Sequence, residues 1–306
     1  MEKVLSGKPI SARIRKVIKE TISSNFLNPR MKLFQVGSDP ASKFYIQNII
    51  RQGEKLGCKI DLLDLPFQTS QDELLEYIRS ANEDSSVHGI MVQKPLPKHI
   101  NDTIAGASIY PNKDIDCLNP VNLGKIVLQE DSLLPATPFA VLCTLRYYNV
   151  PVQGSHVLII GRSSIVGKPL ANMLLWKKNY TNASVTVCHS RSKDLADLTR
   201  SADIVVAALG KAEFVTADMI KENCVLIDVG INEKTDADGT TSYVGDIDYN
   251  SCYDKALAIT PVPGGIGSVT TSLLFLNLCK ACLADGGINK SIDDFLALIF
   301  NDYNKF

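Results

Sequence analysis

The chain has 306 residues, of which 45% are hydrophobic and 21% are charged, and its 32 Lys and Arg residues nearly balance its 33 Asp and Glu residues. This composition is ordinary for a globular protein, and the length favours two domains. Proteins that bind nucleic acid or a membrane surface usually carry a basic excess, which is missing here. The bulk properties therefore favour chemistry on a small molecule, with no nucleic-acid or membrane partner.

Apolar runs and cysteines indicate the compartment. Residues 1–10 contain no apolar segment typical of a signal peptide, and no apolar run approaches the roughly 20 residues that cross a bilayer. The eight cysteines are scattered, and only Cys279 and Cys282 are close, without a second pair or a nearby histidine to complete a zinc site. We expect a cytoplasmic protein with reduced thiols and no metal.

The first half of the chain alternates helical and strand patterns. Apolar residues recur at helical spacing in three segments, separated by short apolar runs. The predicted helices cover residues 9–26, 42–56 and 71–80, and the predicted strands cover residues 32–36, 60–65 and 89–92. This alternation predicts right-handed crossovers and a parallel sheet. A Pro-rich stretch at 134–138 and a helix through Tyr147 then lead into the second half.

A strand predicted at residues 157–160 runs directly into a glycine-containing loop, Gly161 to Gly167, and then into a helix. Such a turn aims backbone N–H groups and the positive end of the helix at a phosphate. The loop lacks the middle glycine of the standard dinucleotide fingerprint, because Ser163 occupies it. Taken alone, the loop fits a plain tight turn equally well. Further predicted strands cover residues 185–187, 204–207, 225–229 and 258–259, and the last predicted helix covers 272–284.

The end of the predicted strand at 185–187 bears on the choice of nucleotide. It continues into His189-Ser190-Arg191, at the place where folds selective for NAD commonly carry an acidic residue. Arg162, Ser190 and Arg191 are instead suited to a 2'-phosphate, because arginine offers a planar fork for two hydrogen bonds. This pattern favours NADP, the alternative being that these side chains are solvated surface groups.

Six ordered motifs together resemble the bifunctional methylenetetrahydrofolate dehydrogenase/cyclohydrolase family over residues 7–278. They are the helix 42–57 with Tyr45, Val92-Gln93-Lys94-Pro95-Leu96-Pro97, Lys113-Asp114-Ile115-Asp116, Pro135-Ala136-Thr137-Pro138, the loop 161–169, and Thr260-Pro261-Val262-Pro263-Gly264-Gly265-Ile266-Gly267. The resemblance implies a two-domain α/β protein. Residues 1–138 would form a folate-binding domain, with a C-terminal helix region at 270–300 packing back on it, and residues 139–269 a Rossmann-type NADP-binding domain.

The family resemblance also implies an enzyme of one-carbon metabolism, with links to purine biosynthesis, that works as a homodimer. Folate would lie between the domains, with Tyr45 stacked on it, Gln93 nearby and Asp116 holding the pterin. These roles fit the chemistry, since a carboxylate accepts adjacent N–H groups as a pair and a flat ring favours an aromatic face. The loop Pro263-Gly264-Gly265 would shape the substrate site. The implied NADP-binding residues are Thr137, Gly161, Arg162, Ser163, Ile165, Val166, Gly167, Ser190, Arg191 and Ile231.

One departure from the family pattern bears on the reaction. In the family, a lysine one helical turn after the tyrosine is the main catalytic group for cyclohydrolase chemistry, whereas this chain has Ile49 there. Hydride transfer to a nicotinamide needs alignment, but hydrolysis needs a water to add and protons to move. Cys117 and Ser268, at family Gly and Pro positions, are smaller departures that we expect the fold to tolerate.

Three hypotheses follow from this departure. The first is an NADP-dependent methylenetetrahydrofolate dehydrogenase whose cyclohydrolase activity is weak or absent. The second is a fully bifunctional enzyme in which Lys94 or another group replaces the lysine, although Arg51 is a poor base and Lys94 should point away from Gln93. The third is a silent folate- or nucleotide-binding module that acts through a partner.

Overall fold

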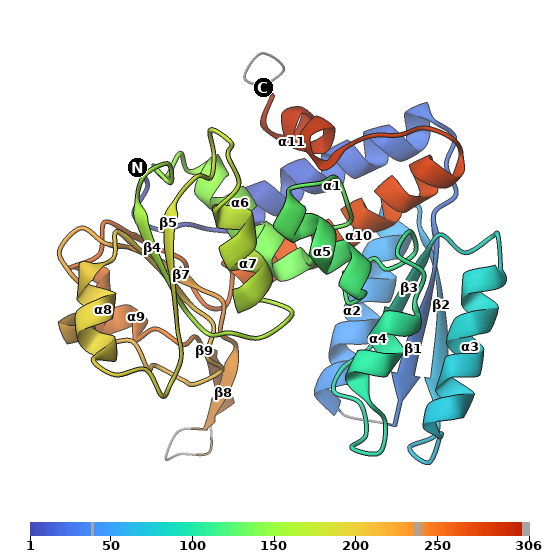
Figure 1. The fold of residues 1–306 in the computed structure, drawn as a ribbon, viewed down its shortest axis with the longest axis horizontal. Coiled ribbons are helices and arrows are strands. Elements are labelled where there is room, and N and C mark those ends of the chain that lie inside the picture. The colour runs from blue at the N-terminus through green and yellow to red at the C-terminus, as the bar shows by residue number, and fades with distance from the viewer. Residues whose placement is uncertain (38–39, 236–238, 240, 302–306) are drawn as a thin grey trace. The chain divides into compact units, whose positions relative to one another are not determined.

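The computed structural model describes residues 1–37, 40–235, 239 and 241–301, including their side chains except at positions 40, 41 and 44. The chain forms two compact units (Figure 1). One consists of Met1–Ala12 and Ala136–Thr270, and we call it the five-stranded unit after its main sheet. The other consists of Arg13–Pro135 and Thr271–Phe306, and we call it the three-stranded unit.

The three-stranded unit contains a parallel sheet in the order β2-β1-β3. Its strands are β1 (Arg30–Val36), β2 (Lys59–Leu65) and β3 (Gly89–Val92), and its helices include α2 (Pro40–Leu56), α3 (Gln71–Glu83), α4 (Asp102–Ser108), α5 (Pro120–Leu128) and α11 (Ile292–Phe300). Two long helices, α1 (Lys8–Ser24) and α10 (Ile266–Asp285), have most of their residues in this unit. The predicted parallel sheet and the return of the C-terminal helices to this unit are confirmed.

The two faces of this sheet are covered differently. Phe34, Val36, Ile90 and Val92 share one hydrophobic cluster, which includes Leu74, Ile78 and Ala81 of α3. Because side chains alternate along a strand, Leu33, Gln35, Met91 and Gln93 face the other side. Helix α10 packs on that side, since a Cβ added to Gly89 would lie 2.8 Å from Leu278. A Cβ added to Gly53 of α2 would meet Ile60 of β2 and Phe275 of α10, so α2 packs there as well.

The five-stranded unit contains a parallel sheet in the order β10-β7-β6-β4-β5. Its strands are β4 (His156–Ile160), β5 (Ser184–Cys188), β6 (Ile204–Ala207), β7 (Val225–Asp228) and β10 (Ala258–Ile259), and its helices are α6 (Ala136–Tyr147), α7 (Gly167–Leu174), α8 (Leu195–Ser201), α9 (Tyr249–Tyr253) and the 3-10 turn η1 (Ala217–Met219). The chain runs outward in one direction from β4 to β5 and in the other through β6, β7 and β10. This reversal beside β4 is the topological switch point of a Rossmann-type fold, as predicted.

Residues 1–12 belong to this second unit and not to the domain predicted for residues 1–138. Leu5 N donates to Ile259 O over 2.9 Å, and Ile259 N donates to Lys3 O over 2.9 Å, so the segment extends the sheet beyond β10. Gly7 N also donates to Gly264 O over 2.8 Å. The segment contributes a single isolated bridge, Val4 with Ile259, and such a short pairing leaves no strand pattern in the sequence.

The sequence patterns missed two further features. The antiparallel hairpin of β8 (Asn232–Thr235) and β9 (Thr241–Val244) is mostly polar and exposed, so it carries no buried-strand signal. Helix α10 begins six residues before the predicted helix at 272, and it is a 20-residue helix apolar enough by composition to cross a membrane. That contradicts the expectation that no apolar run approaches this length. The protein buries 78% of its most apolar window, as expected for a core helix.

Candidate functional site

The loop after β4 is built so that backbone groups crowd together. Gly161 has φ 138°, and a Cβ there would lie 2.2 Å from Ala208 O, in the loop after β6. A Cβ on Gly167 would lie 2.0 Å from Gly161 O. Ser163, at the middle glycine position, closes the loop instead, because its Oγ accepts from Val166 N over 3.1 Å and its carbonyl from Lys168 N over 3.1 Å. The loop delivers exposed backbone at the start of α7, as a phosphate site requires.

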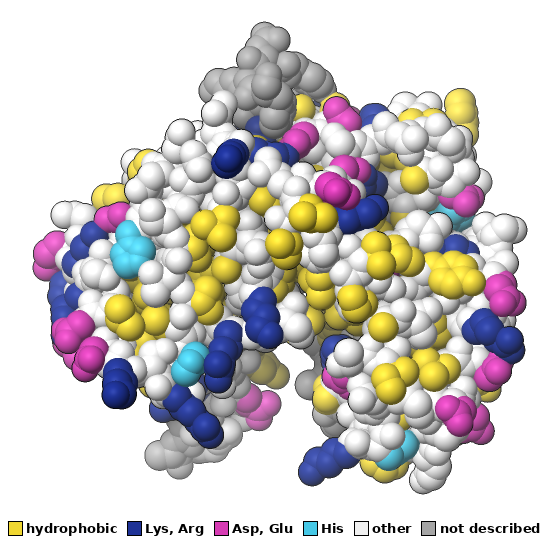
Figure 2. Space-filling view, viewed as in Figure 1, with side chains coloured by type: hydrophobic (Ala, Val, Ile, Leu, Met, Phe, Trp, Pro, Cys, Tyr) yellow, Lys and Arg dark blue, Asp and Glu magenta, His cyan; other side chains and the backbone are white. Residues whose placement is uncertain are grey.

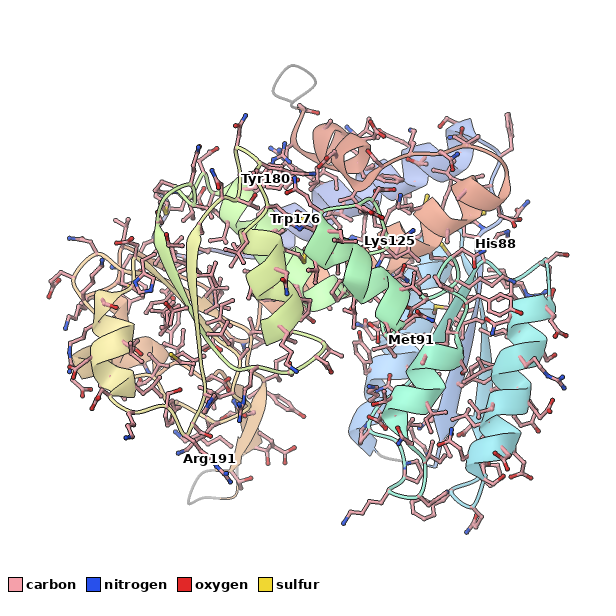
Figure 3. The ribbon with its side chains drawn as sticks, in the orientation of Figure 1. His88, Met91, Lys125, Trp176, Tyr180 and Arg191 are labelled. Atoms are coloured by element: carbon pink, nitrogen blue, oxygen red, sulfur yellow. The ribbon has the colours of Figure 1, made fainter. Side chains whose placement is uncertain are left out.

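The loop after β5 begins with His189, Ser190 and Arg191, and its carboxylate, Asp194, stands at the N-cap of α8. Arg191 is exposed, and its backbone N–H donates to His189 Nδ1 over 3.1 Å, while His189 N donates to Ser192 Oγ over 3.1 Å. Arg162, Ser163 and Ser190 are exposed as well. Figure 2 shows Lys and Arg side chains gathered near a histidine on the five-stranded unit, and Figure 3 labels Arg191 at the edge of that unit. The side chains predicted to take a 2'-phosphate are therefore free to reach a ligand.

Two buried carboxylates that the sequence reasoning missed hold the loops after β6 and β7. Asp246 accepts from the backbone N–H of Gly210 and Lys211, both over 2.9 Å, and from Asn232 Nδ2 over 2.8 Å. Asp228 accepts from the N–H of Asp246 over 2.9 Å and of Ile247 over 2.8 Å. Burial raises the pKa of Asp228 to about 7. In the sequence each aspartate merely stands close to a glycine, in Asp228-Val229-Gly230 and Gly245-Asp246, which is a weak signal for this hydrogen-bond network.

The remaining residues predicted to bind the nucleotide or to shape the site occupy loop or terminal positions in the same unit. Thr137 is half-buried at the start of α6, and Ile165 and Ile231 are exposed by 42% and 62%. In the loop Pro263-Gly264-Gly265, Pro263 is exposed and Gly264 has φ 108°. Ser268, at the family Pro position, donates from Oγ to Gly265 O over 2.7 Å and thereby supports this loop.

In the three-stranded unit, Tyr45 and Asp116 lie within electrostatic reach of each other. Tyr45 is on α2, and its hydroxyl shares a hydrogen bond with the side chain of Thr271 on α10. Burial, reinforced by the negative charge of Asp116, raises the pKa of Tyr45 to about 12. Tyr45 therefore stays neutral at physiological pH and offers an aromatic ring with one fixed polar end.

Asp116 sits in the loop that follows the bridge between Ile90 and Asp114. Burial and the neighbouring Asp114 raise the pKa of Asp116 to about 7, and the ammonium of Lys94 opposes that shift. Lys94 Nζ also lies 3.4 Å from Asp102 Oδ2. The Lys94 ammonium is therefore close enough to affect the pKa of Asp116. The sequence predicted only that Lys94 points away from Gln93, and it did not predict this proximity.

The other residues of the motif around Asp116 hold this loop in place through hydrogen bonds. Lys113 is 8% exposed and donates from Nζ to the carbonyls of Asn82 and Asp84, each over 2.8 Å, capping the C-terminus of α3. Asp114 accepts from the N–H groups of Leu118 and Asn119 over 2.9 and 2.8 Å. Cys117, at the family Gly position, has φ 58°, a left-handed conformation that glycine adopts without cost. Of these residues, Asp116 is the one left to face a ligand.

Gln93 and Ile49 complete the predicted folate residues. Gln93 follows β3, is 9% exposed, and donates from Nε2 to Lys94 O over 2.5 Å. Its Oε1 is buried and has no hydrogen-bond partner in the described part of the chain. Ile49 lies one turn after Tyr45 on α2 and is fully buried, with 0% exposure. The position where the family resemblance expects a lysine is therefore occupied by apolar packing.

Comparison with known proteins shows which family has these features. Residues 5–116 match the catalytic domain of tetrahydrofolate dehydrogenase/cyclohydrolase, and residues 135–285 match its NAD(P)-binding domain. The bifunctional protein FolD of Chloroherpeton thalassium is 43% identical over 286 residues, which cover 91% of this chain and 97% of that protein.

Solved structures agree in fold. The bifunctional FolD enzyme of Campylobacter jejuni has a TM-score of 0.87 at 38% identity, covering 93% of this chain and 99% of that one. The Trypanosoma brucei methylenetetrahydrofolate dehydrogenase-cyclohydrolase, solved with NADP cofactor and an inhibitor, has a TM-score of 0.86 at 32% identity, covering 94% and 99%. The chain therefore belongs to the tetrahydrofolate dehydrogenase/cyclohydrolase family.

Proposed function

We propose that this chain oxidises 5,10-methylenetetrahydrofolate to 5,10-methenyltetrahydrofolate with NADP, and that its hydrolysis of the methenyl product is weak or absent. The observation that carries the proposal is the contrast on α2, where Tyr45 keeps its polar environment while Ile49 is fully buried. The relatives described above are dehydrogenase/cyclohydrolases, and one was solved with NADP. We further propose that it acts in the cytoplasm, and as the homodimer that the family resemblance implies.

The nucleotide loop fits this cofactor. The backbone at Gly161 and Gly167 packs so closely against other backbone that neither residue could carry a side chain, which is typical of a phosphate-binding loop. Arg162, Ser190 and Arg191 are exposed, and the segment His189-Ser190-Arg191 directly after β5 has no carboxylate, which supports recognition of the 2'-phosphate of NADP. The bound nicotinamide supplies the hydride acceptor, and the protein supplies alignment.

The folate residues support the substrate. The Asp116 carboxylate accepts adjacent N–H groups of a pterin as a pair, the Tyr45 ring offers a face for stacking, and the unpaired Gln93 Oε1 offers an acceptor. None of these groups has to move a proton during hydride transfer. The loss of the lysine therefore falls on hydrolysis, where a positioned acid or base is typically worth about 100-fold to 10,000-fold.

Lys94 favours a second candidate function, the fully bifunctional enzyme. Its ammonium acts on Asp116 and lies 3.4 Å from Asp102, so a cation is available beside the proposed pterin residue. If Lys94 replaces the lysine, Lys94→Met should abolish hydrolysis while the aliphatic stem and its packing remain. A Lys98→Met variant, which changes an exposed lysine of the same segment, is the control.

Both candidates are tested by following nucleotide reduction and methenyl decay separately in one purified preparation. We expect NADP reduction by methylenetetrahydrofolate, a lower rate with NAD, and methenyl decay far slower than NADP reduction. Rapid decay that Lys94→Met removes would establish the bifunctional candidate. Tight binding of NADP or folate without turnover of either would support a silent binding module and reject the dehydrogenase.

A further inference from the structure

Gln35 and Gln93 are neighbouring amides at the carboxyl ends of two paired strands. Phe34 of β1 is in register with Val92 of β3, and Gln93 N donates to Phe34 O over 2.8 Å, so the ladder continues through Gln35 and Gln93. Adjacent strands lie about 4.8 Å apart. Both side chains face the side of the sheet opposite the cluster that contains Phe34 and Val92, because side chains alternate along each strand.

Each amide carries one buried polar atom without a partner. Gln35 is 4% exposed and Gln93 is 9% exposed. Gln35 Nε2, a donor, and Gln93 Oε1, an acceptor, have no hydrogen-bond partner among the described residues. The orientation of Gln93 is set by its own neighbour, because the Lys94 carbonyl accepts from Nε2 and only Oε1 can point the other way.

These two atoms are complementary, yet they do not bond to each other. A buried donor or acceptor left unpaired costs about 1–3 kcal/mol, so such atoms in a native protein normally have a partner in water or a ligand. Asp64, the ladder neighbour of Gln35 on β2, is exposed and does not accept from Nε2. The pair therefore suits one small group that accepts a hydrogen bond from Gln35 and donates one to Gln93, which is the bonding pattern of water.

We propose that Gln35 and Gln93 hold one water molecule between them, and that this water adds to the methenyl carbon in whatever hydrolysis the chain performs. The inference rests on the proposed function, because it takes Gln93 to lie beside the folate. Ligands of open parallel sheets bind beyond the carboxyl ends of the strands, which is where both amides stand. Gln35 thereby becomes a positioning residue for the hydrolytic half-reaction.

The step balances without a further reactant. The water oxygen forms a bond to the methenyl carbon, and one of the two carbon–nitrogen bonds of that carbon breaks, returning its electron pair to nitrogen. One water proton ends on that nitrogen and the other leaves to solvent, so the products are the formyl compound and one released proton. Neither glutamine gains or loses a proton. Their contribution is to hold the oxygen in place.

The test compares Gln35→Met with Leu33→Met. Methionine keeps the length of glutamine but removes the donor, and Leu33, fully buried two residues earlier on the same face, gives a matched change of packing without a polar loss. We expect Gln35→Met to lower enzymatic methenyl decay about tenfold more than it lowers NADP reduction. Leu33→Met should change both rates in proportion.

Three results would overturn the proposal. They are an unchanged ratio of the two rates in Gln35→Met, methenyl decay in the wild type no faster than the uncatalysed reaction, and a high-resolution crystal structure of the wild type without a water between Gln35 Nε2 and Gln93 Oε1. The last measurement decides the matter even if Gln35→Met fails to fold. Failure of the wild type to reduce NADP would reject the proposed function instead, so the two failures are distinguishable.

Discussion

The two units prepare their proposed sites by different means. In the five-stranded unit, backbone atoms of Gly161 and Gly167 crowd together. The Asp246 carboxylate fixes the loop after β6 by accepting hydrogen bonds from backbone N–H groups of that loop. In the three-stranded unit, the proposed site consists of side chains. Burial and neighbouring charges raise the pKa values of Tyr45 and Asp116 there. A backbone site fails when a side chain is added, whereas a side-chain site is retuned by changing one group. Substitutions in the two units distinguish these two kinds of site.

Gly161→Ala should have the largest effect. The new Cβ would meet Ala208 O at 2.2 Å and would also require φ 138°, so the loop has to move. A shift of about 1 Å at a binding site costs on the order of 100-fold, and we expect a loss of that size in NADP affinity, measured by titration. Gly124→Ala, where a Cβ meets nothing within 4 Å, is the control. Equal NADP affinity in both variants would show that the site does not depend on backbone crowding.

Lys113→Met should lower the free energy of unfolding by about 2 kcal/mol, because it leaves the carbonyls at the end of α3 without their buried donor. Urea denaturation followed by circular dichroism measures the change. Lys98→Met, at an exposed position, should stay within about 0.5 kcal/mol of the wild type. A similar small change at Lys113 would mean that water replaces the ammonium as the cap.

Asp116 should give the folate site its pH dependence. Its pKa is raised to about 7, so the carboxylate that accepts pterin N–H groups is lost as pH falls through 7, and kcat/KM for folate should fall up to about tenfold per pH unit below that. Stability has the opposite sign, since a carboxyl group with a raised folded pKa contributes most below about pH 4 and loses that contribution as pH rises to about 7.

Asp116→Asn separates these effects from those of Asp228, which also has a pKa of about 7. The variant should lack the wild-type break near pH 7 in kcat/KM, and the difference in stability between the two proteins should change between pH 4 and pH 7. A break that persists in Asp116→Asn would assign the titration to another group.

Cys117→Gly should have the smallest effect. Relief of the left-handed backbone is worth about 1 kcal/mol, and it opposes the loss of a buried side chain and the added freedom of the unfolded chain. We expect a net change within about 1 kcal/mol by urea denaturation. Cys143→Gly, a buried cysteine inside α6 without such a backbone, should be clearly more destabilising. Equal losses would remove the backbone explanation for the family glycine.

Sequence patterns predicted the features that local spacing encodes. The parallel strands, the loop at Gly161 and the helix carrying Tyr45 and Ile49 each depend on residues close together in the chain, and the structure places them in the predicted elements. The sequence identified the motif around Asp116, but it did not show that Lys113 and Asp114 hold the loop in place through hydrogen bonds to backbone groups.

The features that were missed depend on contacts between distant residues. The Asp228 carboxylate accepts a hydrogen bond from the backbone N–H of Asp246, 18 positions later in the chain. Residues 1–12 join the sheet through hydrogen bonds with Ile259, near the other end of the chain. Gln35 looks like any strand residue until the register with β3 shows that it stands beside Gln93. Helix α10 was placed too late because Gly265 and Gly267 resemble a loop, while the Ser268 hydroxyl and the Gly265 carbonyl form the first turn.

The central claim is that an apolar residue at position 49 separates the two half-reactions, and Ile49→Lys tests it most directly against Ile49→Met. Methenyl decay and NADP reduction are measured in both variants and in the wild type. The account predicts that the lysine raises methenyl decay by at least about 100-fold while NADP reduction changes far less, and that methionine raises neither. Unchanged decay in Ile49→Lys, or decay in the wild type as fast as in that variant, would contradict it.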